Sequence, residues 1–112
     1  MRNSQLLIIA ATGLLILSLS SQKQPSRKEI RELDPAQIGE IIQVSGEIKS
    51  YTSNTNSAFM NLSDGTDSIT VVSFNAENQF SRGENVSVTG RVAMYHGRLE
   101  IISEDVSRHL SD

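Results

Sequence analysis

The amino-acid sequence predicts an all-β domain, a small closed barrel of five strands, preceded by a hydrophobic helix. The prediction depends on two stretches that repeat one pattern, residues 42–48 (IQVSGEI) and 86–92 (VSVTGRV). Both alternate apolar and polar side chains, which is typical of a strand with one buried face. Both also carry a glycine at the same step, Gly46 and Gly90. Because a glycine weakens a strand unless the backbone bends or meets another strand closely, the repeat indicates two long, coiled strands that lie side by side.

Residues 1–21 are expected to form a signal peptide or a membrane anchor. An apolar run covers residues 6–19, and no charged side chain falls between Arg2 and Lys23. The run is shorter than the roughly 20 apolar residues of a membrane-spanning helix and is typical of a secretory signal, with small residues placed for cleavage after Ser20. Two alternatives stay open, a cleaved signal and an uncleaved anchor.

Two features of this segment give opposite predictions for the side of the membrane on which the barrel lies. Four basic side chains follow the apolar run, against Arg2 and the amino group before it, and the positive-inside rule then places the domain inside. A charged amine, a short apolar core and small residues at its exit are instead the usual features of export. We expect a membrane-associated or exported protein, with the extracytoplasmic side favoured.

Residues 22–37 predict a linker with short helical turns. The polar residues before residue 28 are typical of a flexible tether. Residues 28–33 place Ile30 and Leu33 on one side of a helical turn. Asp34 is placed to cap a second turn that begins at the following proline.

The barrel itself is expected in residues 38–108. Its strands are placed at residues 40–51, 57–62, 68–74, 85–95 and 98–103. Asp64-Gly65 and His96-Gly97 mark tight turns between consecutive strands.

The connections between the predicted strands indicate how the strands are arranged. Residues 75–80 lack β-branched side chains and predict a short helix or an irregular link. Three strands, a link and two strands form the plan of the oligonucleotide/oligosaccharide-binding (OB) barrel, a partly open Greek key. A sheet this small would leave bare edges unless it closed on itself. The polar residues from 104 onward predict a tail that ends in a helical turn, with 109–112 outside the domain.

Composition and charge exclude several function classes. The chain has no cysteine and two histidines, so it has no disulfide framework and no thiolate metal site. Residues 37–112 carry five basic and ten acidic side chains, whereas residues 1–36 carry five basic and three acidic ones. An acidic barrel argues against tight, purely electrostatic binding to a polyanion, because that affinity scales with the number of phosphates neutralised.

Five motifs resemble one family, the OB-fold nucleic-acid-binding domains of the tRNA-anticodon/helicase type, which also occur in replication protein A-like proteins and aminoacyl-tRNA synthetases. The matching motifs are Ile38-Gly39 with residues 44–48, residues 59–66, 69–72, 83–92 and 97–101. The resemblance implies an OB barrel that binds single-stranded DNA or RNA. The hydrophobic leader and the acidic barrel depart from that family and are shared by a second one, small exported bacterial OB proteins that are thought to bind cations or small ligands.

Binding of a single strand needs aromatic side chains on which bases stack and cations along the backbone track. The candidates are Lys49, Tyr51, Phe59, Asn61, Arg91, Tyr95, His96 and Arg98. We expect Tyr51 and Tyr95 at the surface and Phe80 in the core. For Phe59 and Phe74, packing in the core stays the alternative to a surface role.

No catalytic set can be assembled from the sequence, so we expect a non-enzymatic binding module with no cofactor and no metal site. The DGTD stretch at residues 64–67 lacks the further oxygen ligands of a calcium loop and is better explained as a turn. The main hypothesis is weak binding of single-stranded nucleic acid. The alternative is an extracytoplasmic module that binds a protein, a glycan or a cation.

Overall fold

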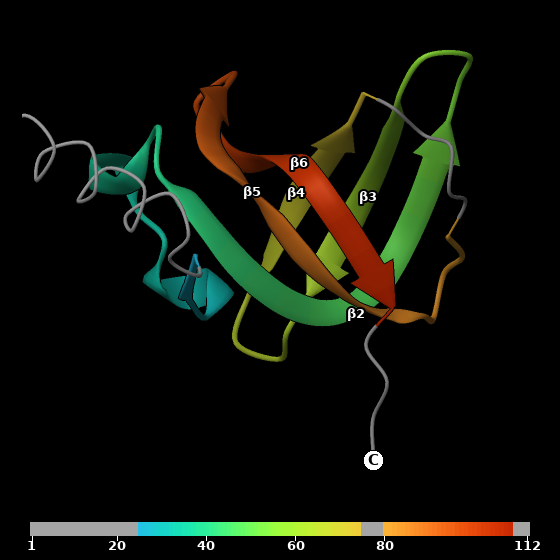
Figure 1. Cartoon of the computed structure of the whole chain (residues 1–112), viewed down its shortest axis with the longest axis horizontal. Coiled ribbons are helices and arrows are strands. Elements are labelled where there is room, and N and C mark those ends of the chain that lie inside the picture. The colour runs from blue at the N-terminus through green and yellow to red at the C-terminus, as the bar shows by residue number, and fades with distance from the viewer. Residues whose placement is uncertain (1–24, 75–79, 109–112) are drawn as a thin grey trace, which may run out of the picture.

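The chain folds into a closed five-stranded barrel with one added strand (Figure 1). A computed structural model of the chain describes residues 25–74 and 80–108. Its elements are β1 (Ser26–Arg27), the 3-10 helices η1 (Ile30–Glu32) and η2 (Pro35–Gln37), β2 (Ile41–Ser53), β3 (Ala58–Ser63), β4 (Ser68–Ser73), β5 (Asn85–Tyr95) and β6 (Arg98–Arg108). Neighbouring strands follow the order β1-β2-β3-β4-β6-β5, and β2 pairs again with β5, which closes the barrel.

The strand pairing confirms the predicted OB plan. All barrel strands pair antiparallel except β4 and β6, which run parallel over three residue pairs. β5 begins and ends at the residues that the sequence predicts, and the other starts agree to within one residue. Figure 1 shows β2 as one long curved strand that serves both halves of the barrel, with β5 alongside its first half and β3 alongside its second.

Gly46 and Gly90 lie on these two neighbouring strands, as predicted. Gly46 pairs with Val86, and Gly90 pairs with Ile42. A Cβ atom on Gly46 would lie 2.4 Å from the carbonyl oxygen of Ser63, and other backbone atoms are nearly as close. Gly46 is therefore required by the close approach of the end of β3 and not by an unusual backbone angle.

Gly90 meets an equally tight environment. A Cβ atom there would lie 2.4 Å from the carbonyl oxygen of Ile102 and 2.6 Å from a side-chain carbon of Ile101. The pairing of β5 with β6 shifts register between Thr89 and Gly90, so Glu104 is an extra residue in β6. This β-bulge sharpens the local bend and twist of the strand.

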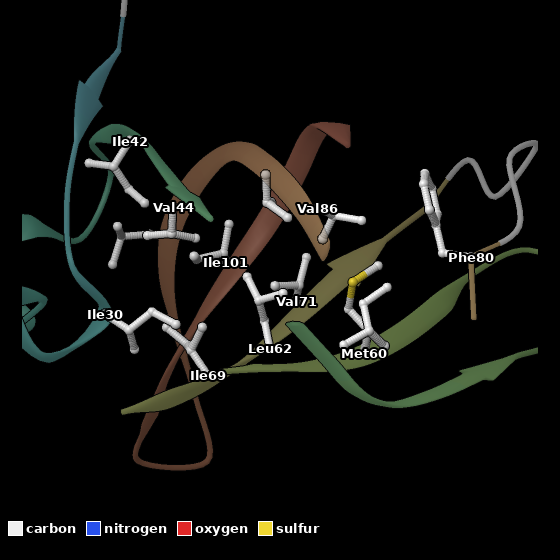
Figure 2. Packing of buried hydrophobic residues seen from close by; sticks show 13 residues of the cluster. Ile30, Ile42, Val44, Met60, Leu62, Ile69, Val71, Phe80, Val86 and Ile101 are labelled. Atoms are coloured by element: carbon white, nitrogen blue, oxygen red, sulfur yellow. The ribbon is translucent and has the colours of Figure 1, made fainter. Parts of the chain in front are cut away.

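The barrel interior holds thirteen buried hydrophobic residues in one cluster (Figure 2). Ile30 from η1 lies at one end of the cluster and Phe80 at the other. Each is less than 10% exposed, so both ends of the barrel are plugged, and the prediction that Phe80 is a core residue is confirmed. The guanidinium of Arg108 lies 4.8 Å from the centre of the Phe80 ring and is held by Glu84 at 2.6 Å.

The sequence prediction for the end of the last strand is wrong. β6 does not stop at Ser103 but continues to Arg108, where the sequence predicted the polar tail to have begun. The bulge at Glu104 explains the error, because one extra residue moves the inward position from Asp105 to Val106 and breaks the simple alternation. Residues 109–112 lie outside the described residues.

The segment before the barrel is partly different from the prediction. Ser26 and Arg27 are not tether but pair with β2 in parallel, and the amide of Lys28 donates to the carbonyl of Gln43 at 2.9 Å. The two short helical turns are confirmed, and the Asp34 side chain accepts from the Ala36 amide at 2.8 Å, as a cap does. The segment is therefore part of the folded domain.

Two predicted elements lie outside the described residues, the hydrophobic helix of residues 1–21 and most of the link at 75–80. Within residues 25–74 and 80–108, no helix is both long enough and apolar enough to cross a membrane.

Substitution of either strand glycine tests the packing argument. We expect Gly46→Ala and Gly90→Ala each to lower the free energy of unfolding by about 1–3 kcal/mol, because the new methyl group has no free space to occupy. Thermal and urea unfolding, followed by circular dichroism, measure the change. Thr89→Ala, next to Gly90 but with its side chain on the outer face, should cost less than about 1 kcal/mol. Alanine variants as stable as the parent chain would contradict the argument.

Candidate nucleic-acid interface

The outer face of the barrel carries an apolar strip across three strands. Phe59 on β3 pairs with Val72 on β4, and Val72 is in register with Ile102 on β6. Val72 points away from the core, yet it is only 4% exposed, whereas Phe59 is 43% exposed. The strip therefore offers one accessible aromatic ring beside buried and half-buried apolar side chains.

A polar row lies next to this strip, two residues further along each strand. Asn61 pairs with Thr70, and Thr70 is in register with Glu100. Two residues further again, Tyr95 pairs with Arg98 at the tip of the β5–β6 hairpin. Stacking surface, hydrogen-bonding groups and a cation thus follow one another across a single face.

A groove of about 590 Å³ opens along this face. It runs from β3 and β4 past the β5–β6 tip to η1, which forms one of its walls. Its lining residues are Ile30, Leu33, Phe59, Asn61, Asp67, Ser68, Ile69, Thr70, Tyr95, His96, Arg98, Leu99 and Glu100.

Five of the eight candidate residues lie together in this groove. They are Phe59, Asn61, Tyr95, His96 and Arg98. The exposure of the Phe59 ring decides the alternative that the sequence left open, in favour of a surface position. Tyr95, 61% exposed, is at the surface as predicted.

The turn at the hairpin tip positions the second aromatic ring. His96 has a φ of 52° and Gly97 a φ of 77°, so both residues adopt the left-handed conformation of a tight hairpin turn, as the sequence indicates. The Tyr95 and His96 rings meet edge to face with their centres 4.1 Å apart. The turn thereby holds two aromatic rings at the rim of the groove.

The three other candidates, Lys49, Tyr51 and Arg91, do not line this groove. Tyr51 also lies on the opposite face of its strand from the one that the sequence predicts. The pairing of β2 with β3 shifts register between Ile48 and Ser50, which leaves Lys49 as an extra residue. The bulge reverses the alternation, so Tyr51 sits opposite Met60 and packs against the core instead of the outer surface.

Lys49 and Arg91 are held by partners outside the groove. The ammonium of Lys49 lies 3.2 Å from a carboxylate oxygen of Glu47. The guanidinium of Arg91 donates to the carbonyl of Gly39 at 3.1 Å and lies 3.8 Å from a carboxylate oxygen of Glu104. No ion pair joins Arg98 to any residue of the described part of the chain.

Several groove residues are absent from the set that the sequence predicts. Ser68, Thr70 and Glu100 could have been found, because alternation along β4 and β6 places them on the outer face beside Asn61. Ile30 and Leu33 could not be found in this way. They reach the groove only through the folding of η1 onto the barrel.

Asp64 fastens η1 to the turn between β3 and β4. Its carboxylate accepts from the Ile30 amide at 2.8 Å, across 34 residues of sequence. It also accepts from the hydroxyl and amide of Thr66 at 2.6 and 2.9 Å and from the Asp67 amide at 3.2 Å. Partial burial raises the pKa of Asp64, but these hydrogen bonds outweigh burial and lower the pKa from 3.8 to about 2.

Comparison with known proteins shows the family to which the chain belongs. Residues 42–108 match the OB-fold nucleic acid binding domain family, and the chain belongs to this family. No curated protein sequence matches the chain.

Several solved structures share the fold at low sequence identity. An aspartyl-tRNA synthetase from Entamoeba histolytica is 18% identical with a TM-score of 0.67, over 78% of this chain and 23% of that one. A chain of a replication protein A heterotrimer bound to single-stranded DNA is 18% identical with a TM-score of 0.60, over 66% of this chain and 60% of that one. An OBody bound to hen egg-white lysozyme is 17% identical with a TM-score of 0.65, over 80% of this chain and 98% of that one.

The role of Asp64 can be tested through the pH dependence of stability. Because its folded pKa lies below the unfolded value, the charged carboxylate stabilises the fold fully above about pH 4, and this contribution is lost as the pH falls towards 2. We expect Asp64→Asn to unfold more easily than the parent chain in urea at pH 7, with a difference that narrows between pH 4 and pH 2.

A neighbouring carboxylate provides the control. Asp67 accepts from the adjacent Ser68 amide at 2.8 Å, a local bond that does not reach η1. Asp67→Asn should therefore destabilise the chain less than Asp64→Asn. A stability difference between Asp64→Asn and the parent that stays constant from pH 7 to pH 2 would be inconsistent with the proposed role.

Proposed function

We propose that this protein is a non-enzymatic binding module that takes a single strand of DNA or RNA, weakly, in the groove between β3, β4 and the β5–β6 tip. The observation that carries the proposal is the exposed Phe59 ring within a groove whose far rim holds Tyr95. Membership of the OB-fold nucleic acid binding domain family supports it, and so does the similarity to a replication protein A chain bound to single-stranded DNA.

The groove residues make three kinds of contact with the strand: stacking, hydrogen bonding and an ionic contact. Bases stack on Phe59 and Tyr95, where each stacked base contributes about 1–3 kcal/mol. Asn61 and Thr70 offer hydrogen-bonding groups to base edges between the two rings. Arg98 contacts the phosphate backbone. One stacking platform at each end and few cations make this binding weak, in line with an acidic domain.

Removal of the central ring is the direct test. We expect Phe59→Ala to weaken the binding of a single-stranded oligonucleotide by roughly 5- to 150-fold, because one stacked base loses its platform. The full chain, in a non-ionic detergent at low salt, is titrated while tyrosine fluorescence is followed, since Tyr95 lies in the groove.

Phe74 is the matched control. It is a second exposed phenylalanine, 64% accessible, and it does not line the groove. Phe74→Ala should bind like the parent chain. Absence of binding to the parent chain at high micromolar oligonucleotide, or equal losses in the Phe59 and Phe74 variants, would overturn the proposal.

A second candidate is an OB module for a protein, a glycan or a cation. The described residues carry eight basic and eleven acidic side chains, a balance that disfavours nucleic acid. The similar OBody is bound to a protein, lysozyme. A thermal shift with calcium or with cell-envelope components, but none with oligonucleotides, would select this candidate.

We further propose that residues 1–21 associate the protein with a membrane or direct its export, with the barrel on the extracytoplasmic side. The apolar run at residues 6–19 supports the proposal. Ser26 and Arg27 pair with β2, so under this proposal the tether to the membrane would end before Ser26.

A reporter fused to the carboxyl terminus tests the proposed location. An enzyme that is active only outside the cytoplasm should be active in this fusion, whereas a reporter that needs the cytoplasm should be silent. The opposite pattern would place the barrel inside, and a fusion found wholly in the soluble cytoplasmic fraction would contradict membrane association and export alike.

A further inference from the structure

We infer that the groove holds a single phosphate, at Arg98, and therefore recognises a short single strand mainly by stacking, with little dependence on salt. This inference rests on the proposed function and names the kind of nucleic-acid contact that the same groove makes. Each neutralised phosphate releases counterions, so the salt dependence of the affinity reports the number of phosphate contacts. This measurement distinguishes a single contact from ordinary polyanion binding.

The number of available cations limits the number of phosphates. Among the described residues, Arg98 is the one lysine or arginine that lines the groove. It lies on the outer face of β6, exposed, and pairs in register with Tyr95. A phosphate beside Arg98 would therefore lie next to a base stacked on the Tyr95 ring.

The nearest alternative cation is already engaged. Arg91 stands at the end of the apolar strip, in register with Ile102. Its guanidinium is shared between the Gly39 carbonyl and the Glu104 carboxylate. A phosphate at this position would have to compete with both partners.

Acidic side chains oppose further phosphates inside the groove. Asp67 and Glu100 both line it, and Glu100 lies two residues from Arg98 on the same face of β6. A phosphate displaced from Arg98 towards the polar row would approach a carboxylate, and like charges repel. The charges thus permit one phosphate position and disfavour its neighbours.

The spacing of the rings fits this arrangement. Phe59 lies two register rows from Tyr95 and Arg98, four residues or about 13 Å along the strand direction, and β4 and β6 also separate it from Tyr95 across the sheet. The register row between them holds Asn61, Thr70 and Glu100, whereas Val72 and Ile102 lie in the same row as Phe59. A strand that crosses the groove therefore meets stacking and hydrogen-bonding surface over most of its path and a cation at one point.

The experiment measures the affinity of the full chain for oligo(dT) of 3, 6 and 12 nucleotides, in non-ionic detergent at pH 8, between 50 and 200 mM salt. One phosphate contact on a single strand gives a slope of about −0.7 in log affinity against log salt, a loss of roughly threefold over this range. Three contacts would give a loss of roughly 20-fold. We expect the threefold loss and little gain in affinity from 3 to 12 nucleotides.

Three substitutions test the contact at Arg98. Arg98→Gln should bring the slope close to zero, and Arg82→Gln, an exposed arginine outside the groove, should leave it unchanged. Glu100→Gln should tighten binding several-fold. A slope steeper than about −1.5, or an unchanged slope in Arg98→Gln, would overturn the single-phosphate inference while the proposed function stood. Absence of all binding would instead remove the proposed function.

Discussion

Two close contacts between backbones hold this molecule in its shape. Gly46 of β2 lies against the Ser63 carbonyl, and Gly90 of β5 lies against the Ile102 carbonyl, each without space for even a methyl group. Near Gly46, β2 leaves its pairing with β5 and takes up its pairing with β3. The glycines are thus the points at which a flat sheet becomes a closed one, and closure brings β4 beside β6.

The groove is a consequence of that closure. β3, β4 and β6 present one continuous outer face only because β4 and β6 pair, and the aromatic tip of the long β5–β6 hairpin lines the same groove. The remaining wall comes from η1, which also supplies the Ile30 plug at one end of the core. Through Asp64 the same short helix is linked to the β3–β4 turn, so one short segment contributes to the core, the turn and the groove.

The sequence predicted the strands and turns whose patterns are local. It failed where a β-bulge adds one residue to a strand. Alternation and paired glycines located the barrel strands, and turn residues located the β3–β4 and β5–β6 hairpins. The bulges at Lys49 and Glu104 each reverse the alternation, and this led to the wrong face for Tyr51 and the wrong end for β6. The partners of Arg91 and the groove wall at η1 depend on contacts between distant parts of the chain, which a local pattern does not encode.

The central claim is that this acidic OB barrel recognises single strands on the outer face of β3, β4 and β6. Amide chemical shifts of the isotope-labelled full chain, titrated with a short single-stranded oligonucleotide, test it most directly. The account predicts that shift changes concentrate at Phe59, Asn61, Thr70 and the β5–β6 tip. Ser45 and Ser87, which pair across β2 and β5 outside the groove, should stay unchanged. Changes confined to that side, or no changes at all, would contradict it.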